Sequence, residues 1–291
     1  MEGKKCASCV PGTFGLTLEN PEGCTKCFCF GRTSQCHQGN YVWIQLSSSD
    51  TRRNLIITRG NTRLEVSQGI LIVPNDNGDS VIGVERLFTT PLYWSLPDVF
   101  LGDKVLSYNG FLRFSTSSNG DTPNSILTDP LVQIQSHDGI IVMEHFSQKL
   151  SISGRYEVRL HENFWLEKGT RLPVTREIFM VALQNIQRIL IRATDLNGAT
   201  EATLKGVTLD LATPSVKLDT RPQALGVEMC QCSKKYSGSS CQNPGRGFYR
   251  WYKEDFKSST YLIDLVGDSK RCQCNGRASE CHPETGHCTG K

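Results

Sequence analysis

The sequence predicts a mainly β protein, in which an antiparallel β-sandwich or jelly roll with one short helix is flanked by small cysteine-rich modules. The first observation is the distribution of the 13 cysteines: six lie within residues 1–36, seven within residues 230–291, and none between them. The second is that the cysteine-free centre consists of short β-type segments separated by turn signals. A segment of that length buries about 70% of its unfolded surface and can form a core without cross-links, whereas the flanks need disulfides or metal.

The central strands are expected where short runs alternate between apolar and polar residues or are apolar throughout. Steps such as Asn109-Gly110 and Asp138-Gly139 between these runs predict tight turns. Many short strands joined by such turns are typical of a two-sheet antiparallel sandwich. The expected strands are Tyr41–Leu46, Asn54–Thr58, Phe111–Thr116, Leu131–Gln135, Ile140–Met143, Arg155–Leu160 and Leu204–Leu211.

One segment of the centre has helical periodicity. Between Thr175 and Asn185, apolar side chains recur at positions 178, 179, 182 and 183, which places them on one face of an amphipathic helix. Thr175 is suited to cap the N-terminus of this helix. The helix leads into Ile186–Arg192, which is an expected strand, so the sandwich should carry one covering helix.

The cysteine-rich flanks contain an internal repeat. The run Cys24-x2-Cys27-x-Cys29-x6-Cys36 aligns without a gap with Ser269-x2-Cys272-x-Cys274-x6-Cys281, and Cys6-x2-Cys9 aligns with Cys241-x2-Pro244. A repeated cysteine unit on both sides of a long cysteine-free stretch is the most specific signal in the chain. Positions 244 and 269 correspond to Cys9 and Cys24, so the second copy lacks one matched pair of cysteines.

These cysteines could bind zinc or form disulfides. The first four have the spacing C-x2-C-x14-C-x2-C, which approximates a zinc ribbon with four thiolate ligands. Two observations oppose this reading. Cys29 and Cys36 follow so closely that they should belong to the same site, and the second copy has Pro244 and Ser269 in place of two ligands. A zinc site that lacks two of its four ligands could not bind the metal. A disulfide, in contrast, can be absent without leaving an unpaired cysteine when both of its cysteines are replaced. We therefore favour disulfides and an oxidising compartment, with zinc as the alternative.

Composition argues against several functional classes. The chain has 32 Lys and Arg against 29 Asp and Glu, and this balance is too even to indicate binding to nucleic acid or to a membrane surface. Apolar runs such as Gly69–Val73 are far shorter than the roughly 20 residues of a membrane helix, so membrane insertion is not expected. No N-terminal segment has the pattern of a signal peptide, so we expect that an extracellular protein with this sequence is a fragment.

Both the flanks and the centre resemble known extracellular families. Cys272–Cys288 resembles the opening of a laminin-type EGF-like module, and Cys232–Cys241 resembles the small third loop of that module. The centre resembles a laminin IV type A domain, and Asn109 stands where that family usually has a second glycine. The segments that carry this resemblance are Tyr93–Phe114, Tyr156–Glu162 with Trp165, and Ile189–Thr194. The resemblance covers nearly the whole chain. It is shared by perlecan, which has a similar arrangement, and the motifs do not separate the two; of these alternatives we favour a laminin α chain.

The resemblance implies a disulfide pairing. In the EGF-like family the eight cysteines pair first with third, second with fourth, fifth with sixth and seventh with eighth. Carried over by position, this gives Cys9–Cys24, Cys27–Cys36, Cys29–Cys230, Cys232–Cys241, Cys272–Cys281 and Cys274–Cys288. Cys6 is left unpaired in this fragment, because its partner would lie upstream of Met1. The sandwich is then expected to be an insertion within one EGF-like module, enclosed by the bridge from Cys29 to Cys230.

The expected domain boundaries follow from this pairing. They are 1–26 (partial EGF-like module), 27–36 (first part of a split EGF-like module), 37–229 (laminin IV type A sandwich), 230–271 (second part of the split module) and 272–291 (partial EGF-like module). The split module lacks its seventh–eighth bridge. We expect its apolar loop residues Trp251, Tyr252, Phe256 and Tyr261–Val266 to pack on neighbouring surfaces in place of that bridge.

No enzymatic activity is expected. His161 and Glu162, together with Glu157 and Glu144, could be read as an acid–base set for sugar cleavage. Adjacent strand positions point to opposite faces of a sheet, however, so His161 and Glu162 are not expected to flank one bond.

Two binding sites on the sandwich are weighed against simpler structural roles. Asp76 and Asp79 are candidate calcium ligands in a short loop, but the loop lacks the bidentate Glu of an EF-hand, and such sequences usually form turns. No other cofactor is expected. Trp43, Trp94 and Trp165 form either a platform on which sugars stack or, as is commoner, part of the core.

The resemblance therefore implies an architectural function. A laminin short-arm module would provide spacing and weak protein contacts and support cell adhesion, as a secreted component of the extracellular matrix in basement membranes. Its partners would be the other laminin chains of the full-length protein, with matrix or cell-surface receptor contacts and no nucleic acid. The alternative is a ligand-binding module that recognises a glycan or a cell-surface receptor through the loops of the sandwich.

Overall fold

The structure is a computed structural model in which two compact units are distinguished. It describes residues 8–17, 23–47, 56–59, 70–74, 80–84, 92–119, 129–147, 154–193, 201–254, 257, 261–276 and 278–289. One unit is Ile44–Leu211, and the other combines Met1–Trp43 with Ala212–Lys291. The first unit contains the sandwich and the second contains the cysteine-rich modules.

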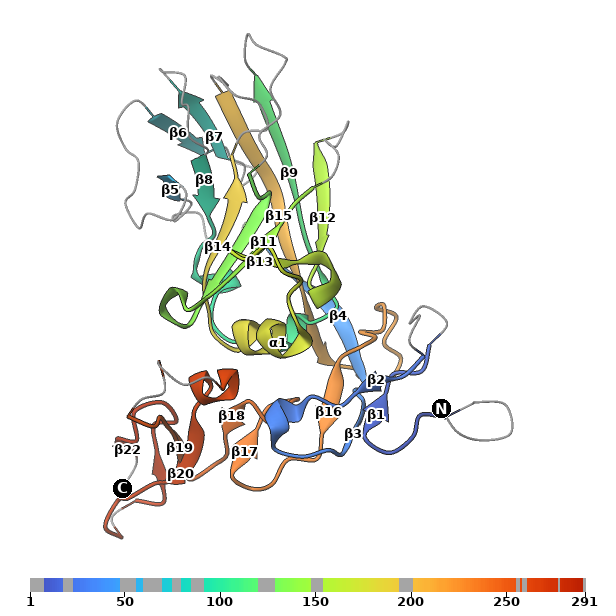
Figure 1. Ribbon diagram of the computed structural model, residues 1–291, viewed down its shortest axis with the longest axis vertical. Coiled ribbons are helices and arrows are strands. Elements are labelled where there is room, and N and C mark those ends of the chain that lie inside the picture. The colour runs from blue at the N-terminus through green and yellow to red at the C-terminus, as the bar shows by residue number, and fades with distance from the viewer. Residues whose placement is uncertain are drawn as a thin grey trace. The chain divides into compact units, whose positions relative to one another are not determined.

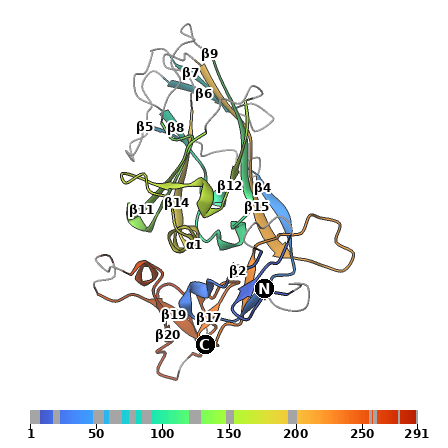
Figure 2. The same ribbon diagram turned by 45° about the vertical axis from the view of Figure 1, so that its right-hand side comes forward.

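The sandwich consists of two antiparallel sheets, which Figure 2 shows facing each other. The order of strands in the first sheet is β13 (Leu166–Glu167), β11 (Ile141–His145), β10 (Val132–Ser136), β14 (Ile186–Arg192), β8 (Leu92–Ser95) and β5 (Ile56–Arg59). The order in the second is β12 (Arg155–Arg159), β9 (Phe111–Asn119), β15 (Glu201–Pro214), β7 (Ser80–Val84) and β6 (Ile70–Pro74), with β4 (Tyr41–Ser47) also paired to β15. The predicted antiparallel sandwich is confirmed.

The core lies between the inner faces of the two sheets, as period-2 patterning requires. In β9, Leu112 and Phe114 are buried, whereas the arginine between them is partly exposed. In the other sheet, Ile134 lies directly opposite Met143 on β11 and Ile189 on β14, and all three are fully buried. Each such side chain contributes about 1.5–3 kcal/mol by burial, so no cross-link is needed inside this unit.

The predicted helix is confirmed as α1 (Arg176–Gln184), which lies across one end of the sandwich (Figure 1). The Thr175 hydroxyl accepts a hydrogen bond from the N–H of Ile178 at 3.3 Å, as expected of an N-cap. Phe179 faces the interior, where its ring lies 5.9 Å from that of Trp165. The chain then enters β14 at Ile186.

Strands are found in the segments where they were predicted, but some are longer than predicted and others were not predicted at all. β15 has 14 residues, because its first residues pair with β7 and β9 although their own sequence has little strand pattern. β8 was not predicted, since its short apolar run is buried on both faces and therefore shows no alternation. Asn54 and Leu55, which begin the predicted strand Asn54–Thr58, lie outside the described residues.

The cysteine-rich unit is built from short antiparallel pairs. These are β1 (Thr13–Phe14) with β2 (Thr25–Lys26), β3 (Cys36–Gln38) with β16 (Glu228–Cys230), β17 (Tyr236–Ser237) with β18 (Asn243–Pro244), β19 (Phe248–Trp251) with β20 (Asp268–Arg271), and β21 (Glu280–Cys281) with β22 (Cys288–Thr289). Single 3-10 turns are η1 (Cys29–Gly31) and η8 (Leu262–Leu265) here, and η3 (Asp98–Phe100), η4 (Val105–Ser107), η5 (His137–Gly139) and η6 (Glu162–Phe164) in the sandwich. In the part of the chain that the structure describes, no helix has the length and hydropathy that a membrane span requires.

Candidate functional site

Six disulfides join the twelve cysteines that the structure describes, and all of them lie in the cysteine-rich unit. The bonded pairs are Cys9–Cys24, Cys27–Cys36, Cys29–Cys230, Cys232–Cys241, Cys272–Cys281 and Cys274–Cys288. Five of the bonds span 9 to 15 residues of sequence, whereas the bond from Cys29 to Cys230 spans 201. Cys6 lies outside the described residues.

Next to this long-range bond, the two ends of the cysteine-free segment run along paired strands within the cysteine-rich unit. In the β3–β16 pair, Cys36 lies opposite Cys230 and Gln38 lies opposite Glu228. The Gln38 amide also donates a hydrogen bond to the carbonyl of Ala224 at 2.9 Å. The two ends of the long intervening segment are therefore held together by backbone pairing, a side-chain hydrogen bond and a disulfide.

Glu228 supplies a buried carboxylate to this junction. The residue is only 2% exposed, and its two carboxylate oxygens accept hydrogen bonds from the N–H groups of Phe28 at 2.8 Å and Cys29 at 2.9 Å. These groups begin η1, in which Cys29 and Phe30 have φ angles of 45° and 47°. A left-handed conformation costs a non-glycine residue about 1–2 kcal/mol, so the carboxylate stabilises the turn that directs Cys29 toward Cys230.

Glu228 also belongs to the one group of potential metal ligands found among the described residues. Its partners in that group are Cys29 and Cys36, and the ligand atoms lie within 4.8 Å of one another. Both cysteines are in disulfides, so neither offers a thiolate, and both carboxylate oxygens already accept hydrogen bonds. The group fits a disulfide frame and does not fit a metal centre. The candidate calcium ligands Asp76 and Asp79 lie outside the described residues.

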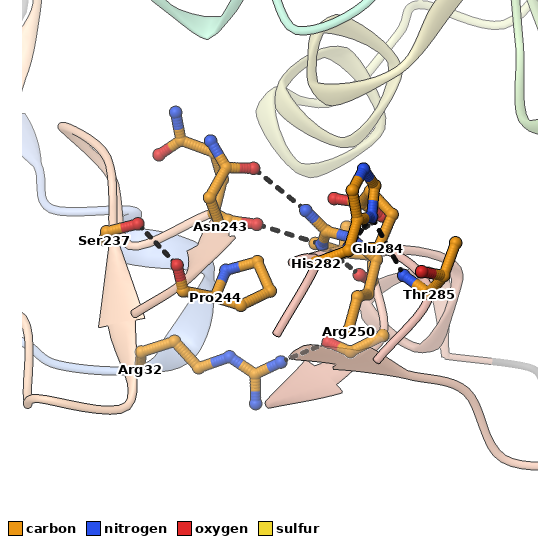
Figure 3. A network of polar contacts seen from close by, with 11 residues as sticks. Arg32, Ser237, Asn243, Pro244, Arg250, His282, Glu284 and Thr285 are labelled. Carbon is orange, nitrogen blue, oxygen red and sulfur yellow. Dashed lines mark hydrogen bonds and ion pairs between the residues drawn. The ribbon is translucent and has the colours of Figure 1, made fainter. Parts of the chain in front are cut away.

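A second polar cluster surrounds Arg250, on β19 (Figure 3). The residue is 5% exposed. Its guanidinium donates hydrogen bonds to the carbonyls of Gln242 at 3.1 Å and Val266 at 2.6 Å and to the Asn243 side chain at 2.9 Å. Its Nε lies 2.8 Å from a carboxylate oxygen of Glu284. One buried side chain thus binds three segments of the cysteine-rich unit.

Arg32 connects the N-terminal part of the cysteine-rich unit to residues 267 and 268, which follow the Arg250 acceptor Val266. Its guanidinium donates a 2.6 Å hydrogen bond to the carbonyl of Gly267 and lies 3.6 Å from the carboxylate of Asp268. The guanidinium also stacks over the ring of Tyr236, 4.6 Å from the ring centre, and the Tyr236 hydroxyl is hydrogen-bonded to Asp268. Burial and then the hydrogen bond to Asp268 raise the pKa of Tyr236 to about 12.

The apolar side chains that were expected to pack on neighbouring surfaces are only partly buried. Leu265 and Val266 are buried, and Trp251 and Tyr252 are partly buried. Tyr261, in contrast, is 71% exposed, so the expectation that it packs on a neighbouring surface is wrong. Phe256 lies outside the described residues. Neither Glu228 nor Arg250 is predicted from the sequence, because no local pattern marks a charged residue whose partners are distant in the chain.

Comparison with known proteins identifies the centre of the chain. Residues 93–228 match the family model described as Laminin B (Domain IV). Residues 93–228 are therefore similar to laminin domain IV, and this central region is called domain IV here. The match ends at Glu228, in the β16 strand that pairs with β3.

The relatives of this domain IV chain are large proteins. It is 32% identical to the mouse "Basement membrane-specific heparan sulfate proteoglycan core protein", over 99% of this chain and 8% of that protein. It is 31% identical to mouse "Laminin subunit alpha-1", over 98% of this chain and 10% of that protein, and 30% identical to the Caenorhabditis elegans "Basement membrane proteoglycan", over 98% and 8%. The chain thus spans a tenth or less of the length of these relatives. The "L4b Domain of Human Laminin alpha-2" has the same fold, with a TM-score of 0.50 and 20% identity over 59% of this chain and 98% of that one.

The structure corrects the sequence argument about His161 and Glu162 in domain IV. β12 ends at Arg159, so these residues are not adjacent strand positions; they begin η6 instead. The turn brings His161 Nδ1 to 3.6 Å from the Glu162 carboxylate, which means that the predicted opposite orientation is wrong. Each group nevertheless has a structural partner. His161 caps η6 by accepting from the N–H of Asn163, and Glu162 accepts a 2.8 Å hydrogen bond from the Tyr108 hydroxyl.

The other two carboxylates of the imagined acid–base set lie elsewhere in domain IV. Glu157, on β12, is 2.8 Å from Arg113 on β9. Glu144, on β11 of the other sheet, accepts a hydrogen bond from Gln133 at 3.0 Å. The four residues are therefore not assembled into one site, and each of them makes a cross-strand or loop contact.

The three tryptophans do not form a sugar platform together. Trp94 and Trp165 are fully buried, and the indole N–H of Trp165 donates to the carbonyl of Arg159 at 2.9 Å. Trp43 is partly buried. The core role, which is the commoner of the two predicted alternatives, is confirmed for Trp94 and Trp165.

A groove on the outer face of the β11–β10–β14 sheet offers little for sugar binding. Its lining consists of Gln135, Asp138, Gly139, Val142, Lys168, Gln187 and Arg188. No aromatic ring is among these residues. Gln187 and Asp138 are hydrogen-bonded to each other, and Lys168 lies 3.9 Å from Glu144, so much of the polar lining is already paired. Within the described residues, the geometry of domain IV therefore fits a packed structural domain better than a glycan-binding cleft.

Proposed function

We propose that this chain is an architectural segment of a secreted matrix protein of the laminin short-arm type. EGF-like modules would form the rod and set its spacing, and domain IV would be carried as an insertion within one of them. The observation that supports this best is the junction, where Cys29 is bonded to Cys230 and β3 pairs with β16. An inserted domain whose ends meet on one strand pair leaves the path of its host module intact.

The relatives support an extracellular setting. The names of two of them place those proteins in basement membranes, and the third is a laminin α subunit. A cysteine-rich unit with so many cross-links suits an oxidising compartment. We infer that this chain is likewise a secreted basement-membrane component that supports cell adhesion and catalyses no reaction. Its partners in the full-length protein would be other laminin chains and weak matrix or receptor contacts.

The proposal includes the disulfide pairing and the domain boundaries. EGF-like modules would occupy 1–26, 27–36 with 230–271, and 272–291, and domain IV would occupy 37–229. Peptide mapping of the secreted, non-reduced protein tests this directly. The expected peptides link Cys29 to Cys230 and Cys9 to Cys24. A peptide that links Cys29 to any other cysteine, or free thiols with bound zinc, would contradict the proposal.

Excision of domain IV tests the architectural role. Because Gln38 and Glu228 are direct partners across β3 and β16, a two-residue Asn-Gly turn can replace residues 39–227 and close the pair as a hairpin. We expect the shortened module to retain the bonds Cys27–Cys36, Cys29–Cys230 and Cys232–Cys241. We also expect a longer multi-module fragment to keep its length in electron micrographs after the excision. A shorter rod, or scrambled disulfides, would show that domain IV is part of the spacer itself.

A further inference from the structure

The split module lacks a bridge at a position that its repeat specifies. Pro244 and Ser269 correspond to Cys9 and Cys24, which are bonded in the first module with Cα atoms 5.8 Å apart. Pro244 lies on β18 and Ser269 on β20, and both are buried. The loop of residues 245–268 therefore has no covalent closure at its base.

Arg250 binds both sides of this gap. It lies directly opposite Ser269 in the β19–β20 pair. Its guanidinium donates to Gln242 and Asn243, which immediately precede Pro244, and to Val266, which lies three residues before Ser269. Figure 3 shows this side chain reaching toward Asn243 beside Pro244. We propose that Arg250 is the noncovalent replacement for the missing disulfide and that it also fixes the joint to the next EGF-like module.

The chemistry of arginine suits this position. A guanidinium presents five N–H donors in a rigid plane and stays ionised, so it can bind several carbonyls at once. A buried charge is tolerated only when hydrogen bonds and a counter-charge compensate its desolvation. Arg250 has both, because two carbonyls, one amide oxygen and the Glu284 carboxylate surround its nitrogens.

The same residue reaches the following module, which a disulfide at the base of the loop could not do. Glu284 lies in the loop between β21 and β22, and the backbone N–H of Arg250 donates to the carbonyl of Pro283 in that loop at 2.7 Å. The N–H of Cys272 donates to the carbonyl of Gly247 at 2.9 Å. Closure of the loop and attachment of the next module are thus coupled through β19. Beyond any spacing role of the segment, Arg250 would thus make the connection between this loop and the following module rigid.

Three variants of the full chain test the inference by hydrogen exchange. In Arg250→Ala, we expect amide protection at residues 266–271 and 282–286 to fall roughly 10- to 100-fold, because bonds from a charged donor are lost. Arg250→Lys should lose nearly as much, since one ammonium cannot span the same acceptors. Arg246→Ala is the matched control: Arg246 pairs with Glu280 but its side chain is 87% exposed, so protection should not change.

Restoring the bridge separates the two roles. Adding Pro244→Cys and Ser269→Cys to Arg250→Ala should recover protection at residues 266–271 but leave residues 282–286 fast-exchanging. If Arg250→Ala alone is not secreted, recovery of secretion by the two cysteines supports the closure role, and failure to recover contradicts it. Unchanged exchange in Arg250→Ala, or an equal loss in Arg246→Ala, would overturn the proposal.

Discussion

Glu228 holds Cys29 in place across 199 residues of sequence. Its carboxylate accepts hydrogen bonds from the N–H of Cys29 and of the preceding Phe28, and Cys29 is the cysteine bonded to Cys230, two residues after Glu228. The disulfide and the carboxylate therefore act on the same turn from the same strand. Glu228 is also the last residue of the domain IV match, so this contact lies at the edge of that match.

The first prediction concerns this carboxylate. Glu228→Ala leaves two buried N–H groups without acceptors and removes an ionised partner, so we expect a loss of about 2–3 kcal/mol in unfolding free energy. Glu228→Gln keeps one acceptor oxygen and should lose less. Urea denaturation of the secreted chain measures both, with the disulfides verified as intact. Equal stability of wild type and Glu228→Ala would show that the contact contributes nothing.

The second prediction compares two disulfides. Replacing both Cys29 and Cys230 by Ser removes a cross-link with a sequence separation of 201, which in the chain-entropy model costs about 5 kcal/mol. Replacing Cys232 and Cys241 removes one with a separation of 9 and should cost about half as much. Denaturation midpoints of the two double variants, compared with that of the wild type, give the ratio of the two losses in unfolding free energy. A smaller loss for the Cys29–Cys230 pair would mean that backbone pairing of β3 with β16 already holds the ends together.

Sequence patterns predicted the parts of the fold that depend on neighbouring residues. Thr175 and the apolar stripe that follows it identified α1, and alternation identified strands such as β9 and β12. β8 escaped detection because both faces of its few residues are buried, which removes the alternation on which the prediction relies. The turn at Glu162 escaped because nothing in Arg155–Leu160 indicates where the strand ends.

The charged residues of the cysteine-rich unit could not have been predicted in the same way. Glu228 binds the N–H groups of residues at the other end of the cysteine-free stretch, and Arg250 binds the carbonyls of Gln242 and Val266, which are distant from each other in the chain. Such partners become visible only when the disulfide-linked loops are in place. The one available signal was the paired loss of cysteine at Pro244 and Ser269, which indicated that some other closure was needed but not which residue provides it.

The third prediction is a pH dependence at Asp268. Burial alone would raise the pKa of this carboxyl, but hydrogen bonds from Tyr236 and the Ser269 N–H and the charge of Arg32 outweigh it and lower the pKa below its usual 3.8. A group with a depressed pKa in the folded state stabilises when it is ionised. Its contribution is fully present above pH 3.8 and is lost as the pH falls through the lower folded value.

The measurement is the stability difference between wild type and Asp268→Asn as a function of pH. We expect this difference to be constant between pH 5 and 8 and to shrink below about pH 4. Tyr236→Phe is the companion variant: because the pKa of Tyr236 is raised to about 12, its contribution should persist below pH 10 and decline as the pH rises toward 12. A wild-type advantage over Asp268→Asn that grows on acidification would contradict the assignment.

The last prediction decides whether Trp165 is a core residue or part of a ligand surface. Trp165 is 1% exposed, packs on Phe179 and donates its indole N–H to Arg159, so Trp165→Ala should cost about 3–5 kcal/mol of unfolding free energy. Trp165→Phe keeps an aromatic ring and should cost less. The adjacent Phe164 is 48% exposed and provides a matched control, since Phe164→Ala should change stability by less than about 0.5 kcal/mol. Thermal unfolding of the three variants ranks them. If Trp165→Ala were as stable as wild type, the ring would have to be a surface group, and the glycan-binding alternative would regain the support that burial of this residue removes.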